Sequence, residues 1–160
     1  MNRESAWFNK NTKRFLTGGI VIFLVFQICD SIIHGPLLGH YYESVSVILR
    51  PDAVELMWIL YPGRLILSFL IIFIFIKGYE DRGIMEGVRF GLMMGIVTYG
   101  MGSLYQYVFF PLPIPMILRW FCYGLIEFIL IGVAAAIIYK PVPEEDKEKE
   151  EDEDDMEIVG

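Results

Sequence analysis

The stretch VELMWILYPGRLILSFLIIFIFI, residues 54–76, decides the class of fold. It contains only two charged side chains, Glu55 near its beginning and Arg64 near its middle. A helix needs ~20 mainly apolar residues to cross the ~30 Å hydrocarbon core of a bilayer. Asp52, three residues before Glu55, gives this stretch the pattern of a capping box that starts a helix. We therefore expect a membrane-spanning helix over residues 54–76.

Three more stretches have the same length and apolar composition, and they cover residues 15–34, 87–110 and 116–139. Hydrophobic residues make up 55% of the chain, which exceeds the usual content of a soluble domain. Lipid is therefore the expected solvent for most of the protein. The expected fold is all-α, a four-transmembrane-helix bundle over residues 14–141 that follows a cytoplasmic N-terminal segment, residues 1–13.

The C-terminal segment has a different composition from the rest of the chain. Residues 144–160 hold eleven acidic residues and two lysines, a net charge of −9, whereas the whole chain has −7 and the remainder therefore +2. The segment lacks apolar periodicity and cannot bury a core, so we expect residues 142–160 to form a disordered acidic tail. Two interpretations stay open: a solvated anionic extension, or a docking segment for a basic partner.

The distribution of basic residues predicts the orientation in the membrane, because loops rich in Lys and Arg stay in the cytoplasm. Arg50 and Arg119 lie on one side of the predicted bundle, and eight basic residues lie on the other. The eight are Arg3, Lys10, Lys13, Arg14, Lys77, Arg82, Arg89 and Lys140. We expect a multi-pass protein of the inner (plasma) membrane with both the N- and C-termini in the cytoplasm.

The two halves of the chain share a weak internal similarity. Residues 57–61, MWILY, align with residues 119–123, RWFCY, and each of the two helices concerned is followed by a lysine. One explanation is a duplicated two-helix hairpin, whose copies would be parallel about an axis normal to the membrane. The other is chance similarity between aromatic-rich helices.

Ionisable residues inside the predicted helices point to a candidate site, because charges within a membrane are costly and commonly functional. Arg64 and Glu127 lie at about the same depth, ~15 Å from one end of their helices at 1.5 Å per residue. An ion pair between them is the simplest way to satisfy both charges. Asp30 and His34, spaced by four residues, share one helix face, and Arg64 could also reach Asp30. The predicted buried polar cluster consists of Asp30, His34, Arg64, Gln106 and Glu127.

Pro62 and Gly63 directly precede Arg64 in the second predicted helix. A proline cannot donate a backbone hydrogen bond, so the carbonyl of Trp58 loses its usual donor and a kink is expected. Irregular backbone at membrane depth is tolerated only against protein or a wet cavity. The kink and the buried charge therefore indicate the same region.

Small residues at four-residue spacing predict close helix packing, because they let two helix backbones approach. The third helix carries Gly87, Gly91 and Gly95, and the fourth carries Gly132 and Ala136. The pattern leaves open whether the partner helix belongs to the same chain or to another.

Residue patterns typical of enzymes and of metal or nucleic-acid sites are not found in the sequence. His34 and His40 lack helical ligand spacing, and Cys29 and Cys122 lie in apolar runs outside any metal motif. The basic residues lie where membrane topology already explains them. We therefore expect no enzymatic activity, no cofactor, no metal and no nucleic-acid partner.

Several short motifs spread over residues 14–141 resemble those of a group of small, uncharacterised bacterial four-helix integral membrane proteins. The resemblance implies a fold and a membrane location, and it supplies no activity. The motifs are Asp30-x-x-x-His34-Gly35, Arg50-Pro51, Lys77-Gly78-Tyr79-Glu80, Glu86-Gly87-x-Arg89-x-Gly91, Pro111-x-Pro113, and Trp120 with Glu127.

Two functional hypotheses follow from these patterns. The first is an accessory or assembly subunit that packs against other membrane proteins, or against itself, through the glycine-rich third helix. The second is a small oligomeric transporter or ion or proton conduit that uses the buried cluster of Asp30, Arg64 and Glu127. A buried salt bridge that only fixes helix register is the structural alternative to the second.

Overall fold

The computed structural model describes residues 3–80 and 82–139, with side chains described from Thr12 onward. These residues form an all-α fold, and no strand occurs among them. The predicted acidic tail, residues 142–160, lies outside the described residues. The helices are α1 Arg3–Ile32, the π-helix η1 Ile33–Leu37, α2 Gly39–Ser44, α3 Ala53–Leu56, the 3-10 helix η2 Met57–Ile59, α4 Leu60–Lys77, α5 Ile84–Gly95, the π-helix η3 Ile96–Gly100, α6 Met101–Phe109 and α7 Ile114–Ile138.

Three helical stretches have the length and apolarity to cross a membrane: Thr12–Leu37, Ala53–Lys77 and Ile114–Ile138. They confirm the long apolar helices predicted over residues 15–34, 54–76 and 116–139. The stretch predicted as one helix over residues 87–110 contains α5, η3 and α6 in succession, because a π-helix interrupts the α-helical hydrogen bonding at Ile96–Gly100. Length and composition thus mark the chain as a helical membrane protein.

Two helix starts differ from the sequence-based boundaries. α1 begins at Arg3 rather than at Phe15, because the apolar run marks where lipid would begin and a helix can continue into polar sequence. α7 begins at Ile114 although Pro115 follows, and Pro113 at its N-cap is extended with φ −62° and ψ 131°. Proline is tolerated in the first turn of a helix, where its missing N–H has no partner to lose.

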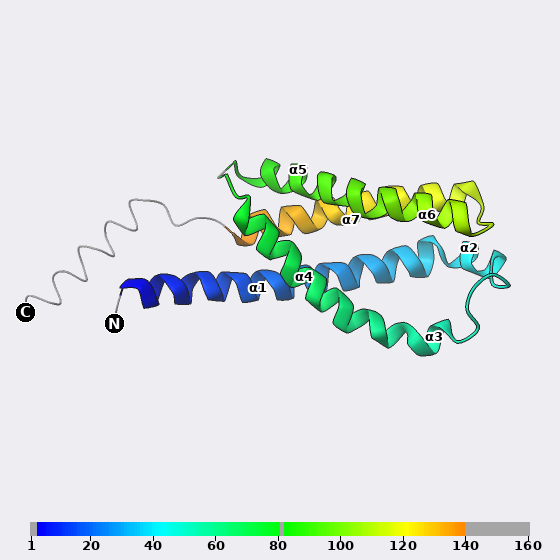
Figure 1. The fold of residues 1–160 in the computed structure, drawn as a ribbon, viewed down its shortest axis with the longest axis horizontal. Helices are drawn as coiled ribbons and strands as arrows, with labels where there is room; N and C mark the ends of the chain where they lie inside the picture. The colour runs from blue at the N-terminus through cyan, green and yellow to red at the C-terminus, as the bar shows by residue number, and fades with distance from the viewer. Residues whose placement is uncertain (1–2, 81, 140–160) are drawn as a thin grey trace, which may run out of the picture.

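Figure 1 shows how the helices are arranged. α5 and α6 run along α7, and α4 crosses α1 at an angle. The C-terminal part of α4 therefore lies near α5 and α7, whereas its N-terminal part and α3 stand away from the other helices. We call the region around residues 68–77, α5 and residues 127–138 the closed end, and the region of η1, α2, α3, η2 and α6 the open end.

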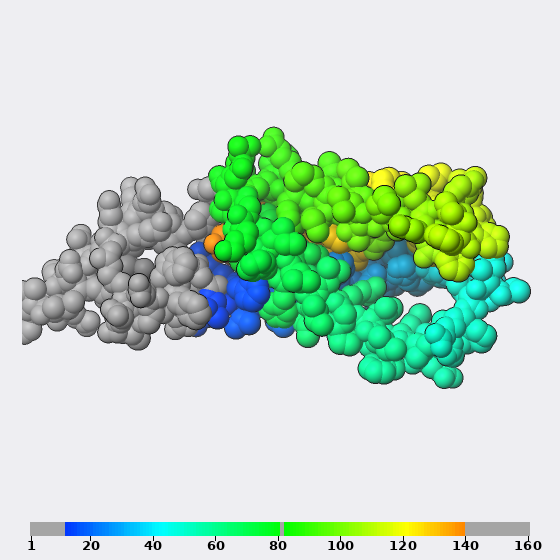
Figure 2. Space-filling model, in the orientation of Figure 1, coloured from blue at the N-terminus to red at the C-terminus, as the bar shows by residue number. Residues whose placement is uncertain are grey.

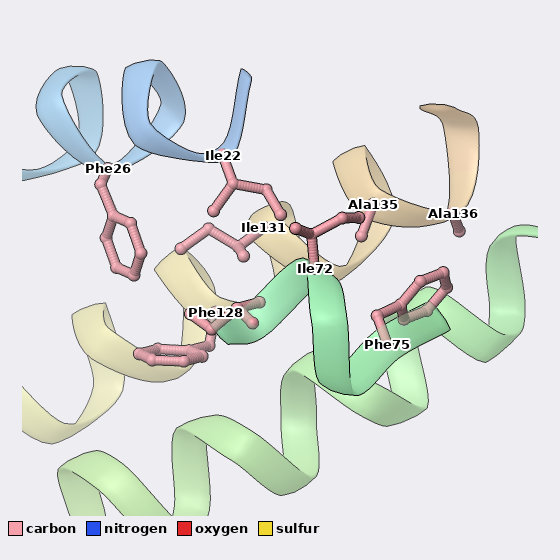
Figure 3. Close-up of a cluster of buried hydrophobic side chains, with 9 residues drawn as sticks. Ile22, Phe26, Ile72, Phe75, Phe128, Ile131, Ala135 and Ala136 are labelled. Atoms are coloured by element: carbon pink, nitrogen blue, oxygen red, sulfur yellow. The ribbon is translucent and has the colours of Figure 1, made fainter. Parts of the chain in front are cut away.

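The hydrophobic core lies at the closed end, where side chains from α1, α4 and α7 meet (Figure 3). Phe26 and Phe128 pack edge to face with ring centroids 5.8 Å apart, and Phe75 makes a similar contact with Phe90 of α5 at 5.2 Å. The buried core residues are Ile22, Phe26, Ile71, Ile72, Phe75, Phe128, Ile131, Ala135 and Ala136.

The predicted packing glycines hold α5 against α7 within this chain. A Cβ placed on Gly87 would lie 2.7 Å from the carbonyl carbon of Gly132 and 2.8 Å from the Cβ of Ala136. One placed on Gly91 would lie 2.7 Å from the Cα of Ile129, and Gly95 is buried in the same interface. The structure therefore answers the question that the spacing left open, because the partner of the glycine row is α7.

The open end is much less packed. Residues 57–63 are exposed on every face of their helices, with Trp58 64% and Tyr61 52% accessible. Figure 2 shows a hollow between this segment and the region around α2. α2 itself is held by a small apolar cluster in which Val45 packs with Leu112 and Met116 at the beginning of α7. The start of α3 also differs from the predicted capping box: Asp52 accepts a hydrogen bond from Arg50 Nε at 2.5 Å, and its side chain does not cap the helix.

Candidate functional site

The centre of the site is an ion pair between α1 and α4. Asp30 lies near the C-terminal end of α1 and is 7% exposed. Its Oδ2 pairs with Nη1 of Arg64 in α4, and the Arg64 side chain is 25% exposed. The simplest sequence-based pairing, Arg64 with Glu127, is therefore not the one observed. The reason is the crossing of α4, which packs extensively on α1 and only slightly on α7.

His34 joins this ion pair to the open end. Its Nε2 lies 3.4 Å from Asp30 Oδ1, and its Nδ1 is hydrogen-bonded to the hydroxyl of Tyr42. The same hydroxyl accepts a hydrogen bond of 2.9 Å from Nε1 of Trp120. One chain of contacts thus runs from α4 through α1, η1 and α2 to α7.

The donors along this chain fit one tautomer of His34. An indole N–H can only donate, so the Tyr42 oxygen accepts from Trp120, and its own O–H is free to donate to His34 Nδ1 when that nitrogen carries no hydrogen. Burial raises the pKa of the Tyr42 phenol, while the hydrogen bond from Trp120 partly opposes that shift, so the phenol keeps its proton at neutral pH. In this tautomer His34 is neutral, and its hydrogen on Nε2 is directed at Asp30.

Glu127 forms a second polar group in the middle of α7. It is 1% exposed, and its Oε2 accepts a hydrogen bond of 2.7 Å from the hydroxyl of Tyr99 in η3. Its Oε1 is buried and has no hydrogen-bond partner. Arg64 is near enough for its charge to act on Glu127. The two polar groups are therefore neighbours without a direct hydrogen bond or ion pair.

Tyr99 is a site residue that the sequence reasoning missed. It continues the four-residue row of Gly87, Gly91 and Gly95, and this spacing alone would have directed it at α7. Gly124 of α7 provides the space, because a Cβ there would overlap the Tyr99 ring. The glycine row thus brings the phenol hydroxyl to Glu127 as well as holding the two helices together.

Gln106 was predicted to lie near the cluster. It lies on α6, two helical turns beyond Tyr99, and is half-buried. In the part of the chain that the structure describes, no hydrogen bond or ion pair joins its side chain to Asp30, His34, Arg64 or Glu127. Gln27, on the same face of α1 as Asp30, has a buried Oε1 without a hydrogen-bond partner.

Each of the three irregular helices lies next to this site. The π-helices η1 and η3 carry His34 and Tyr99, and η2 ends at Ile59, five residues before Arg64.

The irregularity predicted at Pro62 and Gly63 occurs one turn earlier, in η2, because Pro62 occupies the first turn of α4, where its ring is tolerated. The carbonyls of Met57 and Trp58 accept hydrogen bonds from backbone N–H groups at that junction. π-helical turns are rare and are often found at functional sites.

A separate groove lies between the η3–α6 region and the first turns of α7. Its volume is about 700 Å³. Apolar side chains line most of it, and Ser103 and Tyr107 are also among the lining residues. The apolar walls include Ile96, Val97, Leu104, Leu118 and Phe121. This surface fits an apolar occupant such as an acyl chain or a helix.

Comparison with known proteins gives no assignment: the chain matches no family model, no curated protein and no solved structure. The resemblance to a group of small bacterial membrane proteins therefore stays a prediction. The geometry of the site has to carry the functional argument.

Proposed function

We propose that the chain crosses the plasma membrane four times, with α5, η3 and α6 together forming one crossing. The residues Ile84–Phe109 would extend over ~39 Å at 1.5 Å per residue, enough for the ~30 Å hydrocarbon core. The basic residues near the closed end support a cytoplasmic location for both termini. In this orientation the open end faces away from the cytoplasm.

We propose further that the protein is a small transporter or ion or proton conduit whose site is the cluster of Asp30, Arg64, Tyr99 and Glu127. The observation that supports this function is the buried, unpartnered Oε1 of Glu127. The ion pair of Asp30 with Arg64 brings opposite charges together and can serve only to fix helix register. A second buried carboxylate with an unused oxygen is costly without a further role.

The direct test is flux through the full chain in liposomes. A pH-sensitive dye enclosed in the vesicles would report proton movement, and ion-sensitive dyes would report other cations. Glu127→Gln should abolish the flux, whereas the control Glu55→Gln, in the exposed helix α3, should leave it unchanged. Equal flux in vesicles with Glu127→Gln and in vesicles with the unaltered chain would refute the proposal.

A second candidate function is the accessory or assembly subunit, and the exposed segment 57–63 favours it. The glycine row cannot provide the partner surface, because α7 already covers it. The segment around Trp58 and the groove beside α6 are the available apolar surfaces. If this function holds, Trp58→Ala should remove a stoichiometric partner during purification in mild detergent. The control Ile66→Ala, at a similarly exposed position on α4, should retain the partner.

A further inference from the structure

The buried charges of the site do not balance. Asp30 and Glu127 are the buried acidic residues among the described side chains, and Arg64 is the cation that pairs with one of them. His34 adds no charge in the tautomer whose Nδ1 accepts the hydrogen of the Tyr42 hydroxyl. With both carboxyl groups ionised, the site would therefore carry one uncompensated negative charge. Such a charge is very costly in a membrane interior.

The missing positive charge belongs at Glu127. Asp30 already has a cation beside it, because its Oδ2 pairs with Nη1 of Arg64, and its Oδ1 lies 3.4 Å from Nε2 of His34. At Glu127 the hydroxyl of Tyr99 occupies Oε2, while Oε1 is buried without any partner. The compensating charge therefore has to lie at Oε1.

A proton fits this position better than a metal cation. No group of three His, Cys, Asp or Glu side chains in the described ranges could hold a metal ion. A cation at Oε1 would also lie near the guanidinium of Arg64, which would repel it. The titratable groups that act on Glu127 come from four elements, and they are Cys29 of α1, His34 of η1, Arg64 of α4 and Tyr99 of η3.

We propose that Glu127 carries a proton on Oε1 as a neutral carboxylic acid while Arg64 is paired with Asp30, and that this proton is the species the site transfers. The assignment of the transferred species rests on the proposed conduit function. On release, the O–H bond of Glu127 breaks, the proton passes to water, and the electron pair stays on the carboxylate. Arg64 then turns from Asp30 toward Glu127, which moves the uncompensated charge to Asp30, and Asp30 takes up the next proton from water so that the charges balance again.

The structure gives Arg64 room for this exchange. It lies in the half of α4 that buries no side chain, since the buried residues of that helix begin at Ser68. Its side chain is one-quarter exposed. The guanidinium can therefore change partners while the core around Ile72 and Phe75 stays packed.

Infrared spectroscopy of the full chain in liposomes tests the protonation of Glu127 directly, because a protonated carboxyl group has its own carbonyl stretching band. We expect this band at neutral pH in the unaltered chain, its loss in Glu127→Gln, and its retention in Asp30→Asn. Absence of the band at neutral pH, or its persistence in Glu127→Gln, would overturn the proposal.

A second variant covers the case in which Glu127→Gln does not fold. Tyr99→Phe removes the hydrogen bond to Oε2, which is the carbonyl oxygen of the protonated acid, so the band should shift to higher frequency. Tyr105→Phe, at an exposed position on α6, should leave the band where it is. An unshifted band in Tyr99→Phe would contradict the assignment to Glu127.

Two further readouts separate this inference from the conduit function. Exchange of choline for sodium or potassium should not change the carbonyl stretching band. Loss of the band in sodium or potassium would show that a metal ion replaces the proton. A band that behaves as expected in a chain without proton flux would support the protonated Glu127 and refute the conduit. Flux without the band would refute the protonated state alone.

Discussion

Both ends of the molecule contain glycines and large apolar residues, but only the closed end is tightly packed. At the closed end, small residues of α5 face α7 so closely that no side chain fits between the backbones, and aromatic rings fill the space between α1, α4 and α7. At the open end, equally apolar residues of η2 and early α4 lie exposed on every face.

The difference follows from where small residues stand and from how α4 crosses α1. Between apolar helices in lipid, association depends on close packing and hydrogen bonds and not on hydrophobic burial. Gly63 lies in the open half of α4, and a Cβ placed there would contact nothing. Small size alone therefore does not bring helices together. The polar cluster lies at the boundary, where packing stops and the helices diverge.

The largest effect should come from filling the close contact at the closed end. Gly91→Leu would place a side chain against the backbone of Phe128 and Ile129, which cannot move aside as a side chain can. Overpacking typically costs ~1–3 kcal/mol and occasionally more, and because the obstacle here is backbone we expect a loss of ~3 kcal/mol or more in the free energy of unfolding. Thermal unfolding in detergent, followed by helical circular dichroism, would measure it.

Gly102→Leu is the matched control, because a Cβ at Gly102 meets nothing within 4 Å. Its melting temperature should stay near that of the unaltered chain. Equal destabilisation by both substitutions would mean that the α5–α7 contact is not the special feature of the closed end.

At the boundary between the two ends, Arg64→Met should leave Asp30 as an unpaired buried charge. Removing one partner of a buried ion pair costs ~3–5 kcal/mol. Adding Asp30→Asn to Arg64→Met should recover a large part of this loss, because the uncompensated charge disappears. Chemical denaturation of the single and double variants would give the coupling energy.

The control for this prediction is Arg50→Gln. Arg50 pairs with Asp52 on the surface, with side chains 68% and 43% exposed, and such pairs contribute ~0–1 kcal/mol. If Arg64→Met proved as mild as Arg50→Gln, the ion pair with Asp30 would not be holding α4 to α1.

A third prediction compares neighbouring residues of α7. Ile131 is fully buried in the core, whereas Leu130 is 47% exposed. Ile131→Ala should cost ~2–5 kcal/mol, because it leaves a cavity. Leu130→Ala should cost much less, since lipid or detergent can fill the space that it leaves. Similar losses in unfolding experiments would mean that α7 is packed on both faces.

The smallest effect is expected at Tyr99. Tyr99→Phe removes one hydrogen bond to Glu127 and should lower the free energy of unfolding by ~1 kcal/mol. Tyr105→Phe, an exposed position, should change it by less than the error of a denaturation experiment. If Tyr99→Phe left the free energy of unfolding unchanged, the hydrogen bond from Tyr99 to Glu127 would not contribute to stability.

Much of the fold follows from local sequence. Apolar runs of bilayer length predicted four long helices, because the requirement for internal hydrogen bonding in lipid holds whatever the neighbours are. Three of them are confirmed, and the stretch over residues 87–110 is divided into α5, η3 and α6. The same reasoning selected Asp30, His34, Arg64 and Glu127 as candidates, since the cost of a buried charge depends on its position along a helix. Helix starts were less accurate, because helical structure continues beyond the apolar run at Arg3 and accepts Pro115 in a first turn.

Which side chains of the polar cluster contact each other was decided only by the tertiary structure. The choice of Asp30 over Glu127 for Arg64 depends on the angle at which α4 crosses α1, and no local pattern encodes that angle. The contact of Tyr99 with Glu127 needs the space that Gly124 leaves in another helix. The sequence by itself determined which side chains must avoid lipid. Which of them meet depended on the packing of residues far apart in the chain.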